Sequence, residues 1–409
     1  MGRAPDRHAA AREGDGPSRR LLFLTWLAGV SCSAPLAAMG PMLPLVAREF
    51  GLTATLAGTI AAVPFLVRPF LAWPGGVLAD RVGSRPVLSL ALIFIAIFGA
   101  GRALVWSTGA LLVVAMLLGA AVGVAQTTLA SIARSLHPDA ARVTALYTAG
   151  LNTGVLAASV LSAAVFLPLV DGASWRGVFL LWGLAAAVPG IWWGLEPSAP
   201  GAHPHRPAPA AGFLGAQGSR AALLSLAVVF GAQSAIFQGL VAWLPSYYVE
   251  HGLSLARASA PVTAMSVGSL CTGLGSPWLL SRMASRGALW TASVVLIAAM
   301  AGLIGWPQAG SVWAAAIGGG TGIALTVGLA AAAVMAPPGF VGRVTGFVLT
   351  VGHVGAFLGP LLLGLAADAT GRLPAGLTLL ILIAVLLGVA ASVLPVGPPA
   401  RGGSVSGAA

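Results

Sequence analysis

Long apolar stretches dominate the chain and are separated by short polar breaks. Each stretch has about 20 residues or more, the length that an α-helix needs to cross the hydrocarbon core of a bilayer. Glycine and proline occur inside many of them, as is common in membrane-spanning helices. The pattern predicts an all-α membrane protein with twelve transmembrane helices, at 22–47, 55–79, 86–106, 109–134, 143–167, 175–195, 220–248, 257–281, 287–305, 311–335, 344–366 and 374–395.

The longest polar break, residues 196–219, is rich in proline and alanine. This composition is typical of a linker without regular structure. It separates the apolar stretches into two sets of six. We therefore expect a disordered N-terminus (1–20), an N-terminal six-helix half (21–195), the linker (196–219), a C-terminal six-helix half (220–396) and a disordered C-terminus (397–409).

The composition strengthens the membrane interpretation. Hydrophobic residues make up 58% of the chain and charged residues 8%, with a mean hydropathy of +0.94. A soluble protein of this length needs more charge to cover its surface. Cys32 and Cys271 lie in apolar stretches and indicate neither a disulfide framework nor a metal site. The sequence has no GxxxxGK[ST] phosphate loop, so it lacks the chemistry of an ATP-driven pump, and we expect neither enzymatic activity nor a cofactor.

The net charge of +11 comes from arginine, because the chain contains no lysine. With a cytoplasmic N-terminus, 15 of the 21 arginines fall on the cytoplasmic side, five on the outer side and one, Arg68, within a helix. Positive residues concentrate in cytoplasmic loops of membrane proteins. The distribution predicts a multi-pass protein of the cytoplasmic membrane with both termini and the linker in the cytoplasm. It also explains the basic charge without a nucleic-acid partner.

An internal repeat appears when the sequence is aligned with itself at an offset of 201 residues. Three separate segments match at this one offset, and they fall near corresponding helices of the two halves. Transporters built from such repeats place their binding site between the repeats, near the middle of the bilayer. The matching pairs are LPLVAREFGLT (43–53) with LPSYYVEHGLS (244–254), LADRVGSRP (78–86) with LLSRMASRG (279–287), and RVTALYTAGLNTG (142–154) with RVTGFVLTVGHVG (343–355).

The loop GGVLADRVGSRP resembles the signature Gly-x-x-x-Asp-Arg-x-Gly-x-Arg of the major facilitator superfamily. Ser84 stands where a basic residue is usual. The resemblance covers about residues 20–396. GPMLPLVAREFGL, SWRGVFLLWGL and GPLLLGLAADATG are most similar to the cyanate and nitroimidazole transporter branch, and RVTGFVLTVGHVGAFLGP is similar to nitrate/nitrite porters. The matching signature residues are Gly76, Asp80, Arg81, Gly83 and Arg85.

The sequence also departs from related groups. Drug/proton antiporters usually carry an arginine four residues before a glycine in helix 4, where this chain has Ala115 before Gly119. Nitrate porters hold their anion between arginines of helices 2 and 8. In helix 2 that position falls near Ala72, one turn beyond Arg68, and helix 8 contains no arginine.

The resemblance implies a gating role for the signature loop, which steadies the outward-facing state in the superfamily. Independently, a carboxylate such as Asp80 at a helix end can cap the N-terminus of a neighbouring helix, and arginines can bond helix ends. The alternative is that Arg81 and Arg85 reflect only the positive-inside rule.

Arg68 is the most informative single residue. It lies 12 residues before Asp80, about 18 Å from the cytoplasmic end of its helix, and thus near the middle of the bilayer. A charge there costs about 2.5–3.5 kcal/mol on insertion scales. All acidic residues lie at helix ends or in loops, so an external anion is the natural partner. The alternative is that Arg68 bonds carbonyl groups freed by Pro64, Pro69 and Pro74.

Five further polar residues are candidate substrate ligands. Asn152 and His353 occupy equivalent repeat positions, and His353 is a candidate for handling protons. Each could instead stabilise helix packing through hydrogen bonds. The substrate-binding set is Arg68, Gln126, Asn152, Gln233, Gln238 and His353.

These features favour a monomeric secondary transporter that takes up a small anionic solute, with the proton as coupling ion. Export of an organic or toxic compound is the competing interpretation within transport. A non-transporting membrane sensor with the same fold is the second class, and a long soluble output domain, which would favour it, is not evident in the sequence.

Overall fold

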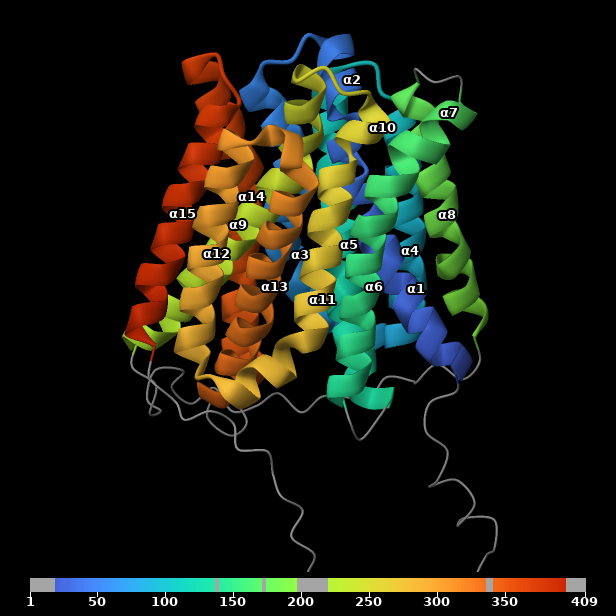
Figure 1. Ribbon diagram of the computed structural model, residues 1–409. Helices are drawn as coiled ribbons and strands as arrows, with labels where there is room; N and C mark the ends of the chain where they lie inside the picture. The colour runs from blue at the N-terminus through green and yellow to red at the C-terminus, as the bar shows by residue number, and fades with distance from the viewer. Residues whose placement is uncertain (1–18, 137–139, 171–173, 197–219, 336–340, 395–409) are drawn as a thin grey trace, which may run out of the picture.

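The computed structural model describes residues 19–136, 140–170, 174–196, 220–335 and 341–394. Every regular element within these ranges is helical (Figure 1). Residues 1–18 of the expected disordered N-terminus, the whole expected C-terminus and nearly all of the expected linker lie outside the described residues. Arg19 and Arg20, which were expected to be disordered, are the first residues of α1. The fold class predicted from the sequence, an all-α membrane protein, is confirmed.

The N-terminal half forms a bundle in which the first span is broken into two helices. The break falls at Ala38, between Pro35 and Pro41, and a proline interrupts the hydrogen bonding of a helix interior. The elements are α1 (Arg19–Ala37), α2 (Met39–Phe50), α3 (Ala54–Val82), α4 (Ser84–Gly101), η1 (Arg102–Leu104), α5 (Thr108–Leu136), α6 (Ala140–Leu161), the π-turn η2 (Ser162–Phe166), α7 (Leu167–Leu169) and α8 (Trp175–Leu195).

The C-terminal half repeats this arrangement. Its long helices lie beside those of the first half, with α14 against α3 and α11 against α6. The elements are α9 (Arg220–Glu250), α10 (Leu255–Ala258), α11 (Ala260–Arg282), α12 (Ser285–Gly305), η3 (Pro307–Ala309), α13 (Gly310–Met335), α14 (Val341–Thr370) and α15 (Pro374–Val393).

Eleven helices in the described ranges are long and apolar enough to cross a membrane. The twelfth expected span corresponds to α11, which runs along the bundle (Figure 1) but is not among the eleven. Its sequence APVTAMSVGSLCTGLGSPWLL is rich in Ser, Thr and Gly, which lowers its hydropathy. The count of twelve spans therefore stays a prediction.

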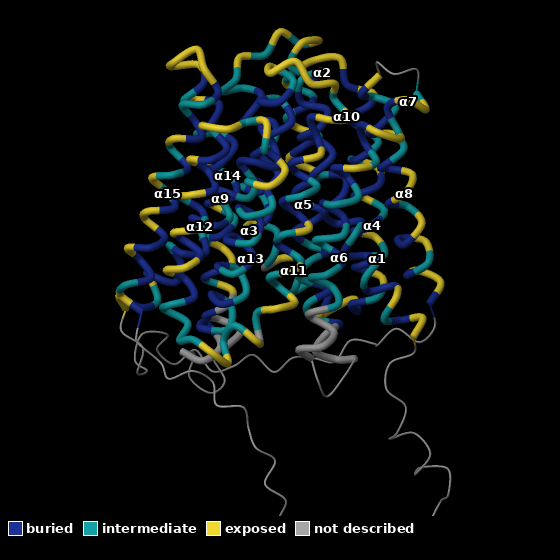
Figure 2. The backbone as a smooth tube through the Cα atoms, in the orientation of Figure 1, coloured by how far each residue is buried: buried dark blue, intermediate teal, exposed yellow. Residues whose placement is uncertain are grey.

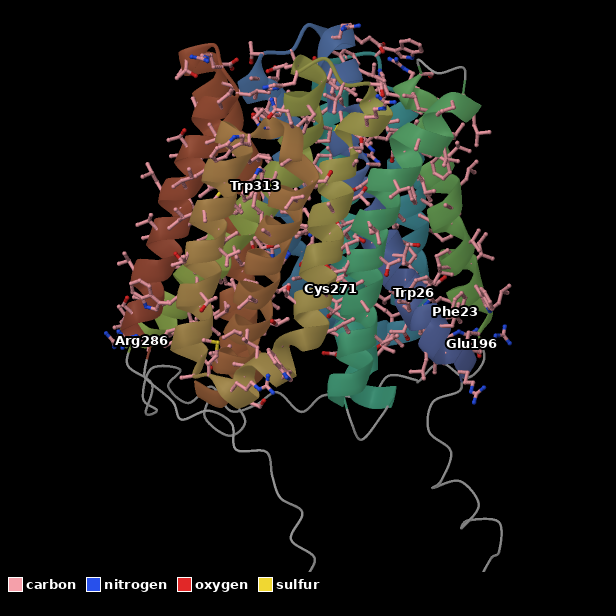
Figure 3. The ribbon with its side chains drawn as sticks, in the orientation of Figure 1. Phe23, Trp26, Glu196, Cys271, Arg286 and Trp313 are labelled. Carbon is pink, nitrogen blue, oxygen red and sulfur yellow. The ribbon has the colours of Figure 1, made fainter. Side chains whose placement is uncertain are left out.

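The bundle has two distinct ends (Figure 1). At one end, the termini end, α1 begins and α15 finishes, and Glu196 lies there at the foot of α1 (Figure 3). The other end, the α2 end, carries α2, α7 and α10. Buried positions lie mainly between the helices, and exposed positions lie on the outside of the bundle (Figure 2). Large apolar side chains such as Leu184 on α8 and Leu382 on α15 are exposed. This distribution fits a protein surrounded by lipid.

The backbones of the two halves approach closely at the α2 end, because glycines at the contact carry no side chain. A Cβ on Gly40 of α2 would lie 2.1 Å from the carbonyl oxygen of Val241 in α9, and one on Gly58 of α3 would lie 2.4 Å from that of Pro360 in α14. Buried residues of both halves, including Met42 and Trp243, belong to one continuous core. The α2 end is therefore closed in this structure.

We predict that Gly40→Ala weakens this closure. Overpacking costs about 1–3 kcal/mol, so the equilibrium between the closed and open α2 end should shift by roughly 5- to 150-fold. Spin labels at Arg48 and Arg257, exposed positions on opposite halves, would report the shift as a longer distance in double electron–electron resonance.

Gly109→Ala is the matched control, because a Cβ there meets no atom within 4 Å. If both variants give the same distance distribution as the parent, Gly40 does not determine how closely the halves approach.

Candidate substrate-binding site

Arg68 lies at the centre of α3, 14 residues from each end of the helix. The helix continues through Pro64, Pro69 and Pro74 without a break in its assignment. Glycines of α5 allow this close approach: a Cβ on Gly123 would lie 2.8 Å from the carbonyl oxygen of Arg68. The backbone carrying Arg68 is therefore fixed against α5, deep within the bundle.

The guanidinium of Arg68 is buried, with 8% of the residue exposed, and lies 4.6 Å from the ring centre of Phe65. Its Nε atom is buried without a hydrogen-bond partner, and no described carbonyl accepts a bond from the side chain. The alternative that Arg68 bonds carbonyls freed by prolines thus finds no support among the described residues. The planar guanidinium of Arg68 therefore keeps strong hydrogen-bond donors available for a ligand.

Arg68 interacts electrostatically with residues of both halves. Cys32 on α1 and Tyr147 on α6 belong to its own half, and His353 on α14 belongs to the other. Of these, His353 was expected as a ligand, whereas Cys32 was assigned no role and Tyr147 was not among the expected ligands. Their closeness to Arg68 depends on how α1, α6 and α14 pack, which no local sequence pattern reveals.

His353 is partly buried, and its Nδ1 lies 2.7 Å from the carbonyl oxygen of Leu349. Because a carbonyl can only accept, Nδ1 carries the hydrogen, and Nε2 is left to accept or release a proton. Gln233 on α9 is buried and donates from Nε2 to Ser234 Oγ at 2.9 Å. Ser234 Oγ in turn lies 3.4 Å from the place a Cβ would take on Gly352, the neighbour of His353.

The other expected ligands are less closely connected. Asn152, Gln126 and Gln238 are partly buried on α6, α5 and α9. No described hydrogen bond joins them to Arg68 or to His353. The structure therefore gives an electrostatic interaction between Arg68 and His353. Gln233 bonds Ser234, which lies near Gly352, and a role for Gln233 and the remaining three residues stays a proposal.

The signature loop lies at the termini end. Gly83 joins α3 to α4 with a φ of 107°, a value that favours glycine. Arg85 donates to the carbonyl oxygens of Gly194 at 2.6 Å and Trp193 at 3.4 Å, the last residues of α8, where a positive charge is favourable. Asp80 and Arg81 are exposed, and Gly76 faces Thr127 of α5.

A second buried arginine, Arg102, has a different environment. It is 1% exposed, donates to the carbonyl oxygens of Pro35 at 2.6 Å and Gly99 at 3.3 Å, and lies 3.9 Å from the ring centre of Phe179. Arg102 is one of the five arginines that the sequence assigned to the outer side. Its side chain supports the carbonyl of Pro35 just before the break between α1 and α2.

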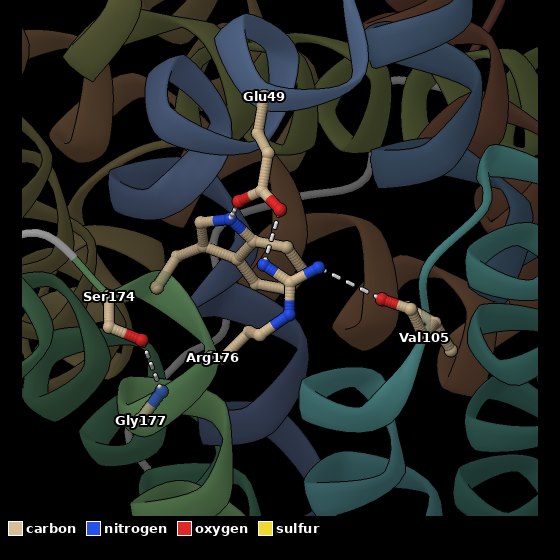
Figure 4. Close-up of polar contacts among 6 residues, drawn as sticks. Glu49, Val105, Ser174, Arg176 and Gly177 are labelled. Atoms are coloured by element: carbon tan, nitrogen blue, oxygen red, sulfur yellow. Dashed lines mark hydrogen bonds and ion pairs between the residues drawn. The ribbon is translucent and has the colours of Figure 1, made fainter.

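A third arginine ties together the α2 end of the N-terminal half (Figure 4). Arg176 at the start of α8 bonds the carboxylate of Glu49 and donates to the carbonyl oxygen of Val105 at 3.0 Å. Trp175 Nε1 also donates to Glu49, at 2.5 Å. Arg102 and Arg176 are thus both committed to protein partners, in contrast to Arg68.

The described residues contain no cluster of His, Cys, Asp or Glu that could hold a metal ion. Both cysteines are free; Cys32 is buried on α1, and Cys271 lies exposed on α11 (Figure 3).

Comparison with known proteins decides the family. Residues 21–317 match the family model described as Major Facilitator Superfamily. The chain belongs to this superfamily. Its relatives are transporters, not enzymes.

Several curated members of the superfamily resemble the chain over most of its length. The cyanate transport protein CynX of Escherichia coli K12 is 26% identical, over 86% of this chain and 91% of that protein. The 2-nitroimidazole transporter of the same organism is 24% identical, over 81% and 84%. A probable nitrate/nitrite transporter NarK2 of Mycobacterium tuberculosis is 28% identical, over 86% and 90%. The branches suggested by the sequence motifs are confirmed.

Solved structures agree on the fold. A bacterial homologue of the human lysosomal transporter Spinster, in an inward-facing and occupied conformation, superposes with a TM-score of 0.74 at 17% identity, covering 93% of this chain and 97% of that one. A D-xylose–proton symporter gives 0.72 at 12% identity, covering 94% and 99%. At these identities the likeness concerns the fold alone.

We predict that Arg102 is structural. Arg102→Lys should lower the thermal unfolding midpoint, because lysine cannot keep both carbonyl bonds and an unsatisfied buried group costs about 1–3 kcal/mol. Solute affinity should stay within about twofold of the parent value, because the Arg102 guanidinium bonds carbonyl groups that are separate from Arg68. Thermal unfolding and ligand titration of the purified variant would check both. A large loss of affinity without loss of stability would place Arg102 in the binding site instead.

Proposed function

We propose that this superfamily member is a secondary transporter that takes up a small anion across the cytoplasmic membrane by alternating access. The observation that carries the proposal is the guanidinium of Arg68, buried at the centre of α3 with an unpartnered Nε. An arginine cannot lose its charge under physiological conditions. A solute that brings its own negative charge would satisfy it.

The ion pairs among described residues support this assignment. Arg20 pairs with Glu196 and Arg176 pairs with Glu49, and both pairs lie at the ends of the bundle. The described acidic residues Asp80, Glu250 and Asp368 also occupy terminal turns of their helices. No described carboxylate is therefore placed to neutralise Arg68 within the membrane.

The names of the relatives point to the same chemistry. Cyanate, hexuronate, nitrate or nitrite, and 3-(3-hydroxyphenyl)propionate are all anions at neutral pH, and they are the named substrates of four proteins that are 26–28% identical to this chain. The planar fork of arginine can donate two parallel hydrogen bonds to an oxyanion. An anionic substrate held by Arg68 suits these relatives and this site.

His353 is the proposed proton carrier. It interacts electrostatically with Arg68 from the opposite half, and its Nε2 is free to exchange a proton. Since both groups would contact one solute from the two halves, binding could be linked to their movement. Gln233, Asn152, Gln126 and Gln238 would then orient the solute.

We predict that Arg68→Lys folds and inserts normally but loses anion affinity by at least about tenfold, because a charge-assisted hydrogen bond is worth ~1.5–3 kcal/mol. Arg68→Ala should lose more. Binding of cyanate, nitrite, nitrate and short carboxylates to the purified protein would measure the change. Arg257→Lys, at an exposed position of α10, is the control and should bind as the parent does. Retained affinity in Arg68→Lys would leave Arg68 as a structural residue.

We also propose that the termini end is cytoplasmic. α1 begins, α15 ends, α8 ends and α9 begins at this end, and the arginine bias of the sequence points the same way. A cysteine introduced by His205→Cys should therefore resist a membrane-impermeant thiol reagent in intact cells and react after permeabilisation. Reaction in intact cells would reverse the orientation.

A further inference from the structure

A carboxylate of the C-terminal half binds the first turn of a helix of the N-terminal half. Asp368, in the last turn of α14, accepts a hydrogen bond from the backbone N–H of Ala54 at 2.9 Å and another from that of Thr55 at 2.7 Å. Both donors are the opening residues of α3. This contact between the halves lies at the closed α2 end.

This contact completes the first turn of α3. The initial N–H groups of any α-helix lack partners within the helix. Thr53 supplies one local acceptor, its side chain taking the N–H of Leu56 at 3.2 Å. The N–H groups of Ala54 and Thr55 bond the two carboxylate oxygens of Asp368 instead. Two donors at the N-terminus of one half are thus satisfied by the other half.

The negative charge of Asp368 is unfavourable for its own helix, α14. A negative charge in the last turn of a helix opposes the helix dipole, whereas the same charge at the N-terminus of another helix is favoured. The backbones of α14 and α3 are in close contact here, since a Cβ on Gly364 would lie 2.3 Å from the carbonyl oxygen of Ala54. Asp368 follows Gly364 by one turn, so the carboxylate lies beside this close contact between the halves.

We propose that Asp368 is a latch that holds the α2 end closed, and that it releases α3 when this end opens. The proposal rests on the alternating access proposed above but not on the identity of the solute. Asp368 is exposed to water, so the contact is weak enough to break during a cycle. It would set how much time the protein spends closed at the α2 end.

Each end of α3 has a carboxylate near it, and the two carboxylates differ in their contacts in this conformation. α3 and α14 pack antiparallel, and α3 also ends on a carboxylate, Asp80 in its last turn. Asp80 is exposed and makes no hydrogen bond among the described residues in this conformation. While the α2 end is closed, Asp368 on α14 is therefore the carboxylate that bonds the other half.

The test measures the α2 end directly. Spin labels at Arg48 and Arg257, in a background with Cys32 and Cys271 replaced by alanine, report the distance between the halves by double electron–electron resonance in liposomes without added solute. Asp368→Ala should raise the population of longer distances about two- to fivefold. Asp368→Asn should give a smaller rise, because its amide keeps one acceptor oxygen.

Glu250→Gln provides the matched control. It also removes an exposed carboxylate at the α2 end, from the last residue of α9. Its distance distribution should equal that of the background. Superimposable distributions for Asp368→Ala, Asp368→Asn and Glu250→Gln would overturn the latch. Because no solute is present, this outcome is independent of whether Arg68 binds an anion.

Discussion

The arginine at the centre of α3 is the constraint on which the account depends. A guanidinium inside an apolar bundle is costly unless something compensates its charge. Arg68 is held there by the close packing of α3 on α5, and it contacts the ring of Phe65 while its Nε lacks a hydrogen-bond partner. We propose that its partner is a solute that arrives from outside.

The other buried or half-buried arginines show what a structural guanidinium looks like in this protein. Arg102 bonds two carbonyls, and Arg176 bonds a carboxylate and a carbonyl while stacking on aromatic rings. Arg85 completes the end of α8. Each of these side chains fixes one helix against another. Arg68 differs from them in having neighbours from both halves and no described hydrogen bond.

Much of the fold could be predicted from the sequence, because spans are set by local hydropathy. The expected span 175–195 coincides with α8, and the central depth of Arg68 followed from counting residues. α11 was the exception in hydropathy, since small polar residues replace aliphatic ones. The contacts that define the closed end could not be foreseen. Asp368 meets Ala54 across 314 residues and Arg176 meets Glu49 across 127, and such pairs depend on tertiary packing rather than on local pattern.

The most direct test of the central claim is a transport assay on the parent protein in proteoliposomes with a panel of small anions, neutral sugars and organic cations. Buried Arg68, without a carboxylate among the described residues to neutralise it, predicts saturable uptake of at least one anion, competition by other anions, and no effect of the cations. Saturable transport of a neutral or cationic compound, with no anion either transported or competing, would contradict the account.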